Sequence, residues 1–279
     1  MNSRKRRIYY WTASLLVFCV ITLFELGPLI WMGLTSIKPA GSEFSIPVRI
    51  FPEQPTGENY RTVTGEGFNI QRALGNSLIV SSTAMIGTLL LSSMAAFVIA
   101  RLRFRCRHTA FFTIQLAGLV PPIIVIAPTF ILLRNTGLLG SLWAMILPHM
   151  AYGIPLATLL ITGFFGSIPV EIDEAARIDG AGSGRIFFRI LLPVISPALF
   201  SAGVLSFLGS WGDFMHAFTV SLGLPRLQTV PVAILSFSSA FQLQWTWIAA
   251  GVMISVVPVV AIVVLFQRYL IGGLTRGAV

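Results

Sequence analysis

The sequence predicts an all-α polytopic membrane protein with six transmembrane helices, and three observations support that fold class. Of the 279 residues, 55% are hydrophobic and only 10% are charged, whereas a soluble domain carries roughly 25% charged residues. The mean hydropathy is +0.84. The apolar residues also gather in runs of about 20, the length that a helix needs to cross a bilayer. One integral membrane domain is therefore expected.

Six apolar runs are long enough to span a bilayer, and each is expected to form one helix. They cover residues 9–34, 75–100, 109–133, 141–165, 194–222 and 246–267. The first run follows the basic stretch RKRR, but it is too long for a signal peptide and no small-residue cleavage site follows it. We interpret it as a retained membrane helix. Prolines within several runs indicate bent helices.

The distribution of basic residues orients the chain. With the N-terminus inside, 13 of the 19 Lys and Arg residues fall in inside segments and 6 in outside segments, as the positive-inside rule expects. The N-terminus (1–8) and the tail (268–279) are then cytoplasmic, and residues 9–279 form a single membrane domain. Residues 35–73 form an external loop and residues 166–193 a cytoplasmic loop. The net charge of +9 thus reflects topology, and no continuous basic face for nucleic acid is visible.

Sequence motifs for catalysis are missing. The chain has no phosphate-binding G-x-x-x-x-G-K-[ST] pattern, no H-E-x-x-H pair and no serine nucleophile elbow. Cys19 and Cys106 are expected to be free thiols, and His108, His149 and His216 are far apart in the sequence. We predict no catalytic residue, no metal ligand and no cofactor in this chain. If transport needs energy, a partner must supply it.

The cytoplasmic loop contains the polar segment EAARIDG (174–180). Pro169 suits the first turn of a helix, and acidic residues at 171 and 173 favour its positive end. A short helix running to Asp179 would end at Gly180, where a positive φ costs little. Ala175 and Ala176 are expected to leave one face thin, so that the surface of another protein can come close.

The loop has the spacing E-A-A, three residues, G, nine residues, I, one residue, L-P. The matching positions are Glu174, Ala175, Ala176, Gly180, Ile190, Leu192 and Pro193. This pattern resembles the cytoplasmic loop of the membrane subunits of ABC importers. From about residue 70 to 279 the chain looks like the carbohydrate-uptake branch, and in particular like the shorter second membrane subunit of maltose-type importers. Stretches that carry this likeness include GNSLIVSS (75–82), SIPVEIDEAARIDGAG (167–182) and SWGDF (210–214). The chain departs from the family at Gly212, where Asn is more frequent.

The resemblance implies a permease subunit of an ATP-driven sugar importer in the bacterial plasma membrane. Its expected partners are a homologous permease subunit, two ATPase subunits that hold ATP and Mg, and an extracytoplasmic solute-binding protein. The loop would carry a coupling helix between the fourth and fifth spans. The tail would either reach between the ATPase subunits or be a frayed terminus. The residues expected to contact the ATPase are Glu174, Ala175, Ala176, Arg177, Ile178, Asp179 and Gly180.

Four polar or aromatic residues are candidates for the substrate path. Asp213 lies within the fifth apolar run, where a carboxylate is expensive and is usually paired or faces a cavity. Trp211 offers a flat face to a sugar ring. Alternatively, Asp213 caps a bent helix near the outer interface and Trp211 packs or belongs to the aromatic belt. Asn76 and Gln115 are either ligand contacts or polar links between helices.

Other function classes stay open at this point. A permease of the same type for an amino acid, a polyamine or glycerol phosphate is possible, although an anionic substrate would favour a basic cluster inside the spans, and none is visible. A stand-alone secondary carrier or channel would call for more buried ionisable groups than Glu25 and Asp213, or for an internal repeat. A membrane-bound enzyme has no supporting group of residues.

Overall fold

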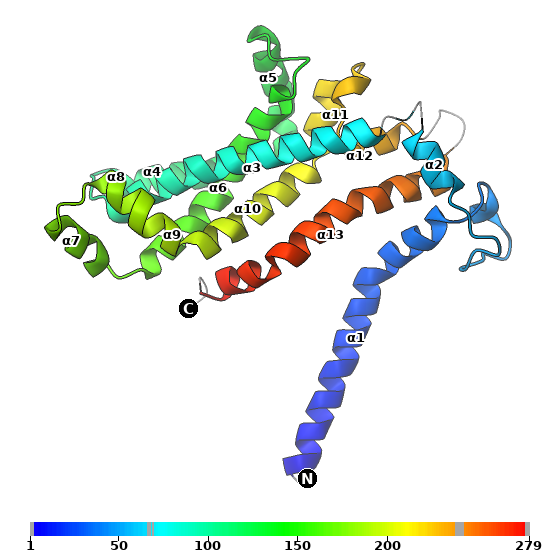
Figure 1. Ribbon diagram of the computed structural model, residues 1–279, viewed down its shortest axis with the longest axis horizontal. Helices are drawn as coiled ribbons and strands as arrows, with labels where there is room; N and C mark the ends of the chain where they lie inside the picture. The colour runs from blue at the N-terminus through cyan, green and yellow to red at the C-terminus, as the bar shows by residue number, and fades with distance from the viewer. Residues whose placement is uncertain (1–2, 66–67, 69, 238–242, 277–279) are drawn as a thin grey trace. The chain divides into compact units, whose positions relative to one another are not determined.

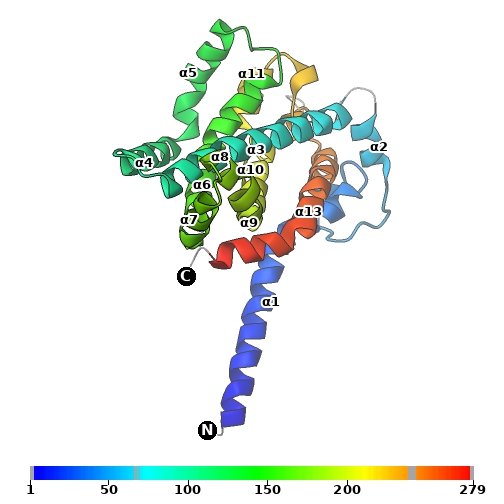
Figure 2. The same cartoon turned by 60° about the vertical axis from the view of Figure 1, so that its left-hand side comes forward.

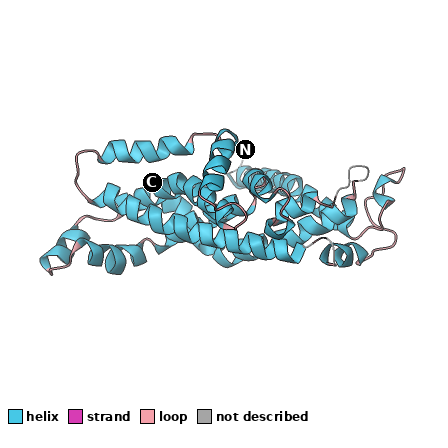
Figure 3. Cartoon of the chain, turned by 90° about the horizontal axis from the view of Figure 1, so that it is seen from above, coloured by secondary structure: helices cyan, strands magenta, loops and turns pink. Residues whose placement is uncertain are grey.

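The computed structural model describes residues 3–65, 68, 70–237 and 243–276, and it consists of helices joined by loops (Figures 1 and 3). The α-helices are α1 (Ser3–Ser36), α2 (Glu58–Thr64), α3 (Ile70–Arg101), α4 (Arg107–Gly118), α5 (Pro122–Asn135), α6 (Trp143–Ser167), α7 (Glu171–Ile178), α8 (Ser183–Arg185), α9 (Leu192–Val194), α10 (Ser196–Trp211), α11 (Met215–Ser221), α12 (Val230–Leu235) and α13 (Trp245–Arg276). Shorter turns of helix are the 3₁₀ segments Ser42–Phe44 and Pro225–Leu227 and the π-helical segment Ile186–Leu191. The predicted all-helical class is confirmed.

Among the described residues, four helices are long and apolar enough to cross a bilayer, and the number of candidate spans rises to six if each of two bent helix pairs counts as one. The four are Trp11–Ser36, Ile70–Arg101, Trp143–Ser167 and Trp245–Gln267. These helices coincide with the first, second, fourth and sixth predicted runs. The third and fifth runs differ from the prediction.

The span predicted over 109–133, with a bend at its prolines, consists of two separate helices. α4 ends at Gly118, α5 begins at Pro122, and the two axes differ by 95°. Pro121 and Pro122 have no N–H to donate, and a residue that precedes a proline is pushed away from the α conformation. Pro121 accordingly has φ −59° and ψ 129°.

The span predicted over 194–222 is also divided into more than one helix. The helical segment Ser183–Val194 meets α10 at 76°, and Pro197, in the first turn of α10, has no N–H for a helical hydrogen bond across this bend. α10 then ends at Trp211, and α11 starts only at Met215. The break between α10 and α11 places Asp213 outside both helices.

The contacts divide the chain into two compact units, residues 1–70 with 234–256 and residues 71–233 with 257–279. In the first unit, the amide of Asn59 is buried and donates to the carbonyls of Ser36 at 2.8 Å and Lys38 at 2.7 Å. The ammonium group of Lys38 donates to the carbonyl of Arg49 at 2.7 Å. These bonds order the segment that follows α1, within the predicted loop 35–73.

The second unit is built around α3, α6 and α10, with α5 lying against α11 (Figure 2). Small residues bring the three central helices together. The Thr88 hydroxyl of α3 donates to the Met150 carbonyl of α6 at 3.2 Å, and the Ser92 hydroxyl to the Ile154 carbonyl at 3.3 Å. A Cβ on Gly153 would lie 2.9 Å from Thr88. Close helix approach through small residues is the usual packing mode in membranes.

Two predictions concern the chain ends. Residues 277–279 of the predicted tail lie outside the described residues, and residues 268–276 continue α13. Residues 1–2 of the N-terminal segment also lie outside them. The cytoplasmic placement of both ends, and the contact of the tail with ATPase subunits, stay predictions.

Candidate functional site

The loop between α6 and α10 carries the short helix α7, which ends before Gly180 as predicted. Gly180 has φ +77°, a conformation that costs other residues strain. Its N–H donates to the carbonyl of Arg177 at 3.0 Å, and the N–H of Ala181 donates to the carbonyl of Ala176 at 2.9 Å. This pair of bonds is a Schellman motif, which satisfies carbonyls at a helix end.

One face of α7 packs onto the chain's own core. Ala176 is only 7% exposed and shares an apolar cluster with Ala181, Phe97 and Phe165. The expectation that both alanines face a partner is therefore wrong for Ala176, whose small side chain lets α7 sit close to the bundle. Ala175, one position earlier, is exposed.

The opposite face of α7 is free within this chain. Glu174, Ala175, Arg177 and Asp179 are exposed, and Ile178 is 87% exposed. Residues 174 and 178 are one helical turn apart, so Glu174 and Ile178 lie on the same face. Leaving a large aliphatic side chain in water forgoes roughly 1.5–3 kcal/mol relative to burying it. This face is the part of the predicted contact region that is open to another protein.

A second polar group is centred on Asp213, between α10 and α11. Its Oδ2 accepts hydrogen bonds from the backbone N–H groups of His216 at 3.1 Å and Ala217 at 3.2 Å. Asp213 thus caps α11, as an N-cap carboxylate does. The same Oδ2 lies 3.2 Å from Nε2 of His149, and Oδ1 lies 3.8 Å from Nδ1 of His216.

Each of the two histidines contacts one further polar side chain. The Nδ1 atom of His149 lies 2.8 Å from the Ser210 hydroxyl, and Nε2 of His216 lies 3.4 Å from the Tyr152 hydroxyl. The rings of His149 and His216, far apart in the sequence, are 6.3 Å apart between centroids. Ser210, His149, Asp213, His216 and Tyr152 therefore form one polar chain, which we call the Asp213 cluster.

The Asp213 cluster lines a cavity of about 220 Å³, together with Pro122, Gly153, Ser206, Gly209 and apolar residues of α6 and α10. This volume is below the roughly 300–1,000 Å³ of pockets that enclose a drug-sized ligand. It suits a small polar group, such as one ring of a larger molecule. In the part of the chain that the structure describes, no group of three His, Cys, Asp or Glu residues is arranged to hold a metal ion.

Sequence reasoning selected Asp213 but missed its four companions. The spacing of polar residues in the predicted spans could have indicated some of them. His149 and Tyr152 are three positions apart in one predicted span, and Ser206 and Ser210 are four apart in another. Such spacings place polar side chains on one helix face. The spacing did not show that the two polar faces meet each other.

The other predicted path residues do not line this cavity. The Asn76 amide donates to the carbonyls of Arg226 and Gln228, both at 2.9 Å, and the Gln115 amide donates to the Pro155 carbonyl at 3.2 Å. Within this chain both therefore serve as polar links. Trp211 is 5% exposed, and its ring stacks on that of Phe207 with centroids 5.5 Å apart.

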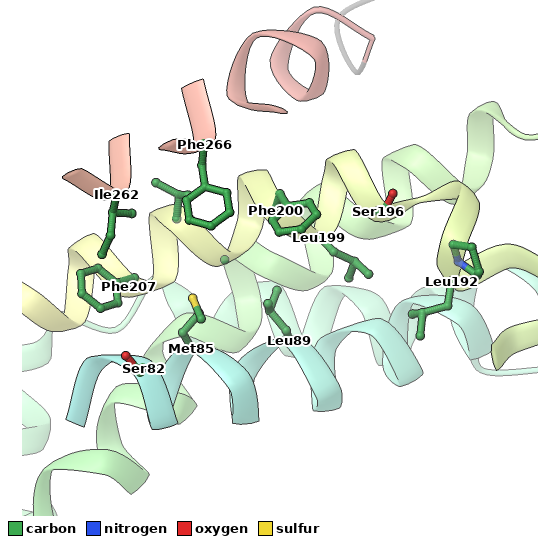
Figure 4. Close-up of a pocket in the computed structure, with 13 residues that line it drawn as sticks. Ser82, Met85, Leu89, Leu192, Ser196, Leu199, Phe200, Phe207, Ile262 and Phe266 are labelled. Atoms are coloured by element: carbon green, nitrogen blue, oxygen red, sulfur yellow. The ribbon is translucent and has the colours of Figure 1, made fainter. Parts of the chain in front are cut away.

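A larger cavity of about 480 Å³ lies between α3, α9, α10 and the second half of α13 (Figure 4). Met85, Leu89, Phe207 and Ile262 line it, as do Phe200 and Phe266, whose rings stack with centroids 5.4 Å apart. Almost all of its wall is apolar. A hydroxyl-rich solute would leave its polar groups unpaired there, which is costly.

Comparison with protein families gives a match over most of the chain. Residues 64–276 match the model described as "Binding-protein-dependent transport system inner membrane component". The matched region contains both α7 and the Asp213 cluster.

Individual relatives agree with this match. The chain is 33% identical to the sulfoquinovosyl glycerol transport system permease protein SmoH of Agrobacterium fabrum, over 92% of this chain and 90% of the relative. It is 31% identical to the trehalose transport system permease protein SugB of Mycobacterium tuberculosis, over 98% of each chain. In fold it resembles a chain of a bacterial ABC transporter involved in the import of the acidic polysaccharide alginate, with a TM-score of 0.80, 20% identity and coverage of 96% of this chain and 99% of the other.

Proposed function

This chain belongs to the family of binding-protein-dependent transport system inner membrane components, and from that premise we propose that it is one permease subunit of an ATP-driven sugar importer. It is a multi-pass membrane protein. Its proposed partners are a homologous permease subunit, two ATPase subunits that bind ATP and Mg²⁺, and an extracytoplasmic solute-binding protein. The observation that carries the proposal is the geometry of α7, a capped helix with one face packed on the bundle and one face open.

The open face of α7 is the proposed ATPase contact. Glu174, Ala175 and Ile178 present a charge, a small side chain and an exposed aliphatic side chain on adjacent positions of the helix. Protein interfaces combine an apolar centre with a polar rim, and Ile178 with its polar neighbours has that arrangement. Arg177, Asp179 and Gly180 border this face. Ala176 contributes by seating the helix.

The inner face of α7 explains how the contact acts on the spans. Asp173 and Ala176 hold the helix on the bundle, so α7 and the membrane helices move together. ATP binding and hydrolysis in the partner subunits would then switch the paired permeases between outward and inward openings.

The Asp213 cluster is the proposed solute contact in this half of the path. A carboxylate accepts hydrogen bonds from hydroxyl groups, and imidazole and phenol groups donate or accept them. Pockets for small molecules combine a few such polar groups with apolar walls. The names of relatives that transport sulfoquinovosyl glycerol or trehalose support a glycoside as the solute.

Glycerol phosphate and other small phosphates are a weaker candidate class. The cavity carries the Asp213 carboxylate, and its described lining includes no Lys or Arg. A phosphate group would be repelled by the carboxylate and would lack the cations that usually bind it. This lining favours hydroxyl groups over phosphate.

Copurification tests the assembly. We expect an ATPase subunit and a homologous permease subunit to be recovered with this chain from detergent-solubilised membranes of a host that expresses the whole system. Sugar flux by this chain alone in liposomes, without ATP, would instead support a stand-alone carrier or channel and would overturn the proposal.

A further inference from the structure

Arg101, the last residue of α3, reaches two other elements at the loop end of the bundle. Its guanidinium Nη2 donates to the carbonyl of Ile168, just after α6, at 2.9 Å. Its Nε lies 3.5 Å from Oδ2 of Asp173 in α7. The side chains of Arg101 and Asp173 are only 4% and 6% exposed. The loop helix is thus attached to α3 by a buried pair of opposite charges.

This pair is hard to explain as a device for stability. Removing two charges from water is costly, and replacing a buried ion pair by apolar residues is often neutral or stabilising. Removal of one partner is damaging, because it leaves the other charge buried and uncompensated. Such a pair therefore holds α7 and α3 in one relative position.

The far end of α3 makes a second attachment. The Asn76 amide binds the carbonyls of Arg226 and Gln228 at 2.9 Å each, and the Ser77 hydroxyl accepts a hydrogen bond from the N–H of Val230 at 2.9 Å. These bonds hold residues 226–230, which we call the 226–230 segment. The buried side chain of Leu227 in this segment shares an apolar cluster with Ala217 and Val220 of α11.

Between its two attachments α3 is built to stay straight. Its 32 residues include no proline, whereas each other described helix of 25 residues or more contains at least one: Pro28 in α1, Pro148 and Pro155 in α6, and Pro258 in α13. Proline is one of the few causes of a sharp kink in a helix. From Asn76 to Arg101 the helix covers about 38 Å at about 1.5 Å per residue.

We propose that α3 acts as a rigid rod that carries the movement of α7 to the 226–230 segment, with Arg101 and Asp173 as the positioning residues at the loop end. From the 226–230 segment the displacement reaches α11, whose N-terminus is capped by Asp213 in the polar cavity. The rod links the proposed ATPase contact to the proposed solute contact. This inference rests on the proposed function, because it assigns a path to the coupling between those two sites.

The test uses the assembled complex in nanodiscs, with the solute-binding protein loaded with a transported sugar. Asp173→Asn removes one charge at nearly constant shape, and Arg101→Gln removes the other charge with a shorter, neutral amide side chain. We expect both complexes to retain their ATPase subunits while stimulation of ATP hydrolysis by the loaded binding protein falls roughly fivefold or more, the usual scale of coupling between sites. The double variant is expected to be no worse than the worse single variant, since both act on one link.

The distal end is tested in the same assay. Asn76→Ala should lower the stimulation as well, and combining it with Asp173→Asn should add little further loss. Ser93→Ala is the matched control, because Ser93 is buried in the same helix and its hydroxyl donates to the Leu90 carbonyl one turn earlier in that helix. In the Ser93→Ala complex, the loaded binding protein should stimulate ATP hydrolysis as strongly as it does in the complex with the unmodified chain.

The outcomes separate this inference from the proposed function. If the unmodified chain binds no ATPase subunit, the proposed function fails. If the loaded binding protein stimulates ATP hydrolysis equally well in the unmodified complex and in the Asp173→Asn complex, the proposed role of α3 is wrong and the proposed function stands. Fully additive losses for Asp173→Asn and Asn76→Ala would also overturn the proposed role of α3.

Discussion

The N–H of Ala181 donates to the carbonyl of Ala176 across the end of α7, and both alanine side chains are buried in the same apolar cluster. An apolar contact between the residues on either side of a Schellman turn commonly accompanies this motif, and it stabilises the C-terminal end of the helix. It also requires that the chain reverse at Gly180 with a positive φ. The small residues and the glycine therefore act together to seat the inner face of α7 on the bundle. The outer face of the helix is left exposed.

The first prediction concerns Gly180. Gly180→Ala should destabilise the loop by roughly 1–2 kcal/mol, because a residue with a Cβ is strained in the left-handed region. Gly180→Asn should cost less, since Asn tolerates that conformation. The control is Gly182→Ala, where φ is −71° and the space around a Cβ is open. Thermal unfolding of the purified complex and retention of the ATPase subunits measure the effect. Equal behaviour of Gly180→Ala and Gly182→Ala would refute it.

The second prediction concerns the outer face of α7. Ile178→Asp should release the ATPase subunits, because it replaces the exposed aliphatic anchor by a charge. The matched control is Ile46→Ser, an isoleucine that is 98% exposed in the loop after α1. Quantitative pull-down of the ATPase subunit is the measurement. A similar loss in both variants would mean that Ile178 has no specific role.

The third prediction separates the two roles of Asp213. Asp213→Asn keeps an oxygen that can cap α11 but removes the charge, whereas Asp213→Ala removes both. Sugar uptake should fall in both variants. Melting temperature should drop clearly only in Asp213→Ala, since losing an N-cap acceptor typically costs about 1 kcal/mol. Normal uptake by Asp213→Asn would show that the carboxylate is structural alone.

The fourth prediction addresses the packing of the central helices. Gly153→Ala should destabilise the bundle, because its Cβ would lie 2.9 Å from Thr88 and 3.0 Å from Ser206. Gly163→Ala in the same helix has open space around the added methyl group. It should be neutral or stabilising by up to about 1 kcal/mol, since alanine favours helices over glycine. Detergent thermal-shift curves compare the two, and an equal loss in both would contradict the packing argument.

Much of the fold could be predicted from apolar runs, because a bilayer imposes span length directly. The stop of α7 at Gly180 was likewise predictable, since glycine is the residue that accepts a positive φ without strain. The prolines at 121 and 122 indicated a bend, but their positions alone did not specify an angle of 95°.

The parts that could not be predicted depend on which helix faces meet. The approach of His149 to His216 requires α6 to pack against α10 and α11, a tertiary contact with no local signal. The burial of Asp173 and Ala176 depends on how a short helix is rotated against the bundle. A charged residue in a polar loop is usually exposed, whereas Asp173 is buried beside Arg101.

Uptake of labelled sugar by proteoliposomes that contain the complete complex tests the central claim most directly. The vesicles are loaded with ATP and Mg²⁺, a panel of mono- and disaccharides is presented with the solute-binding protein, and the unmodified chain is compared with Ile178→Asp. The account predicts accumulation of at least one sugar that requires ATP and is lost with Ile178→Asp. Accumulation that persists without ATP, or that is equal with Ile178→Asp, would contradict it.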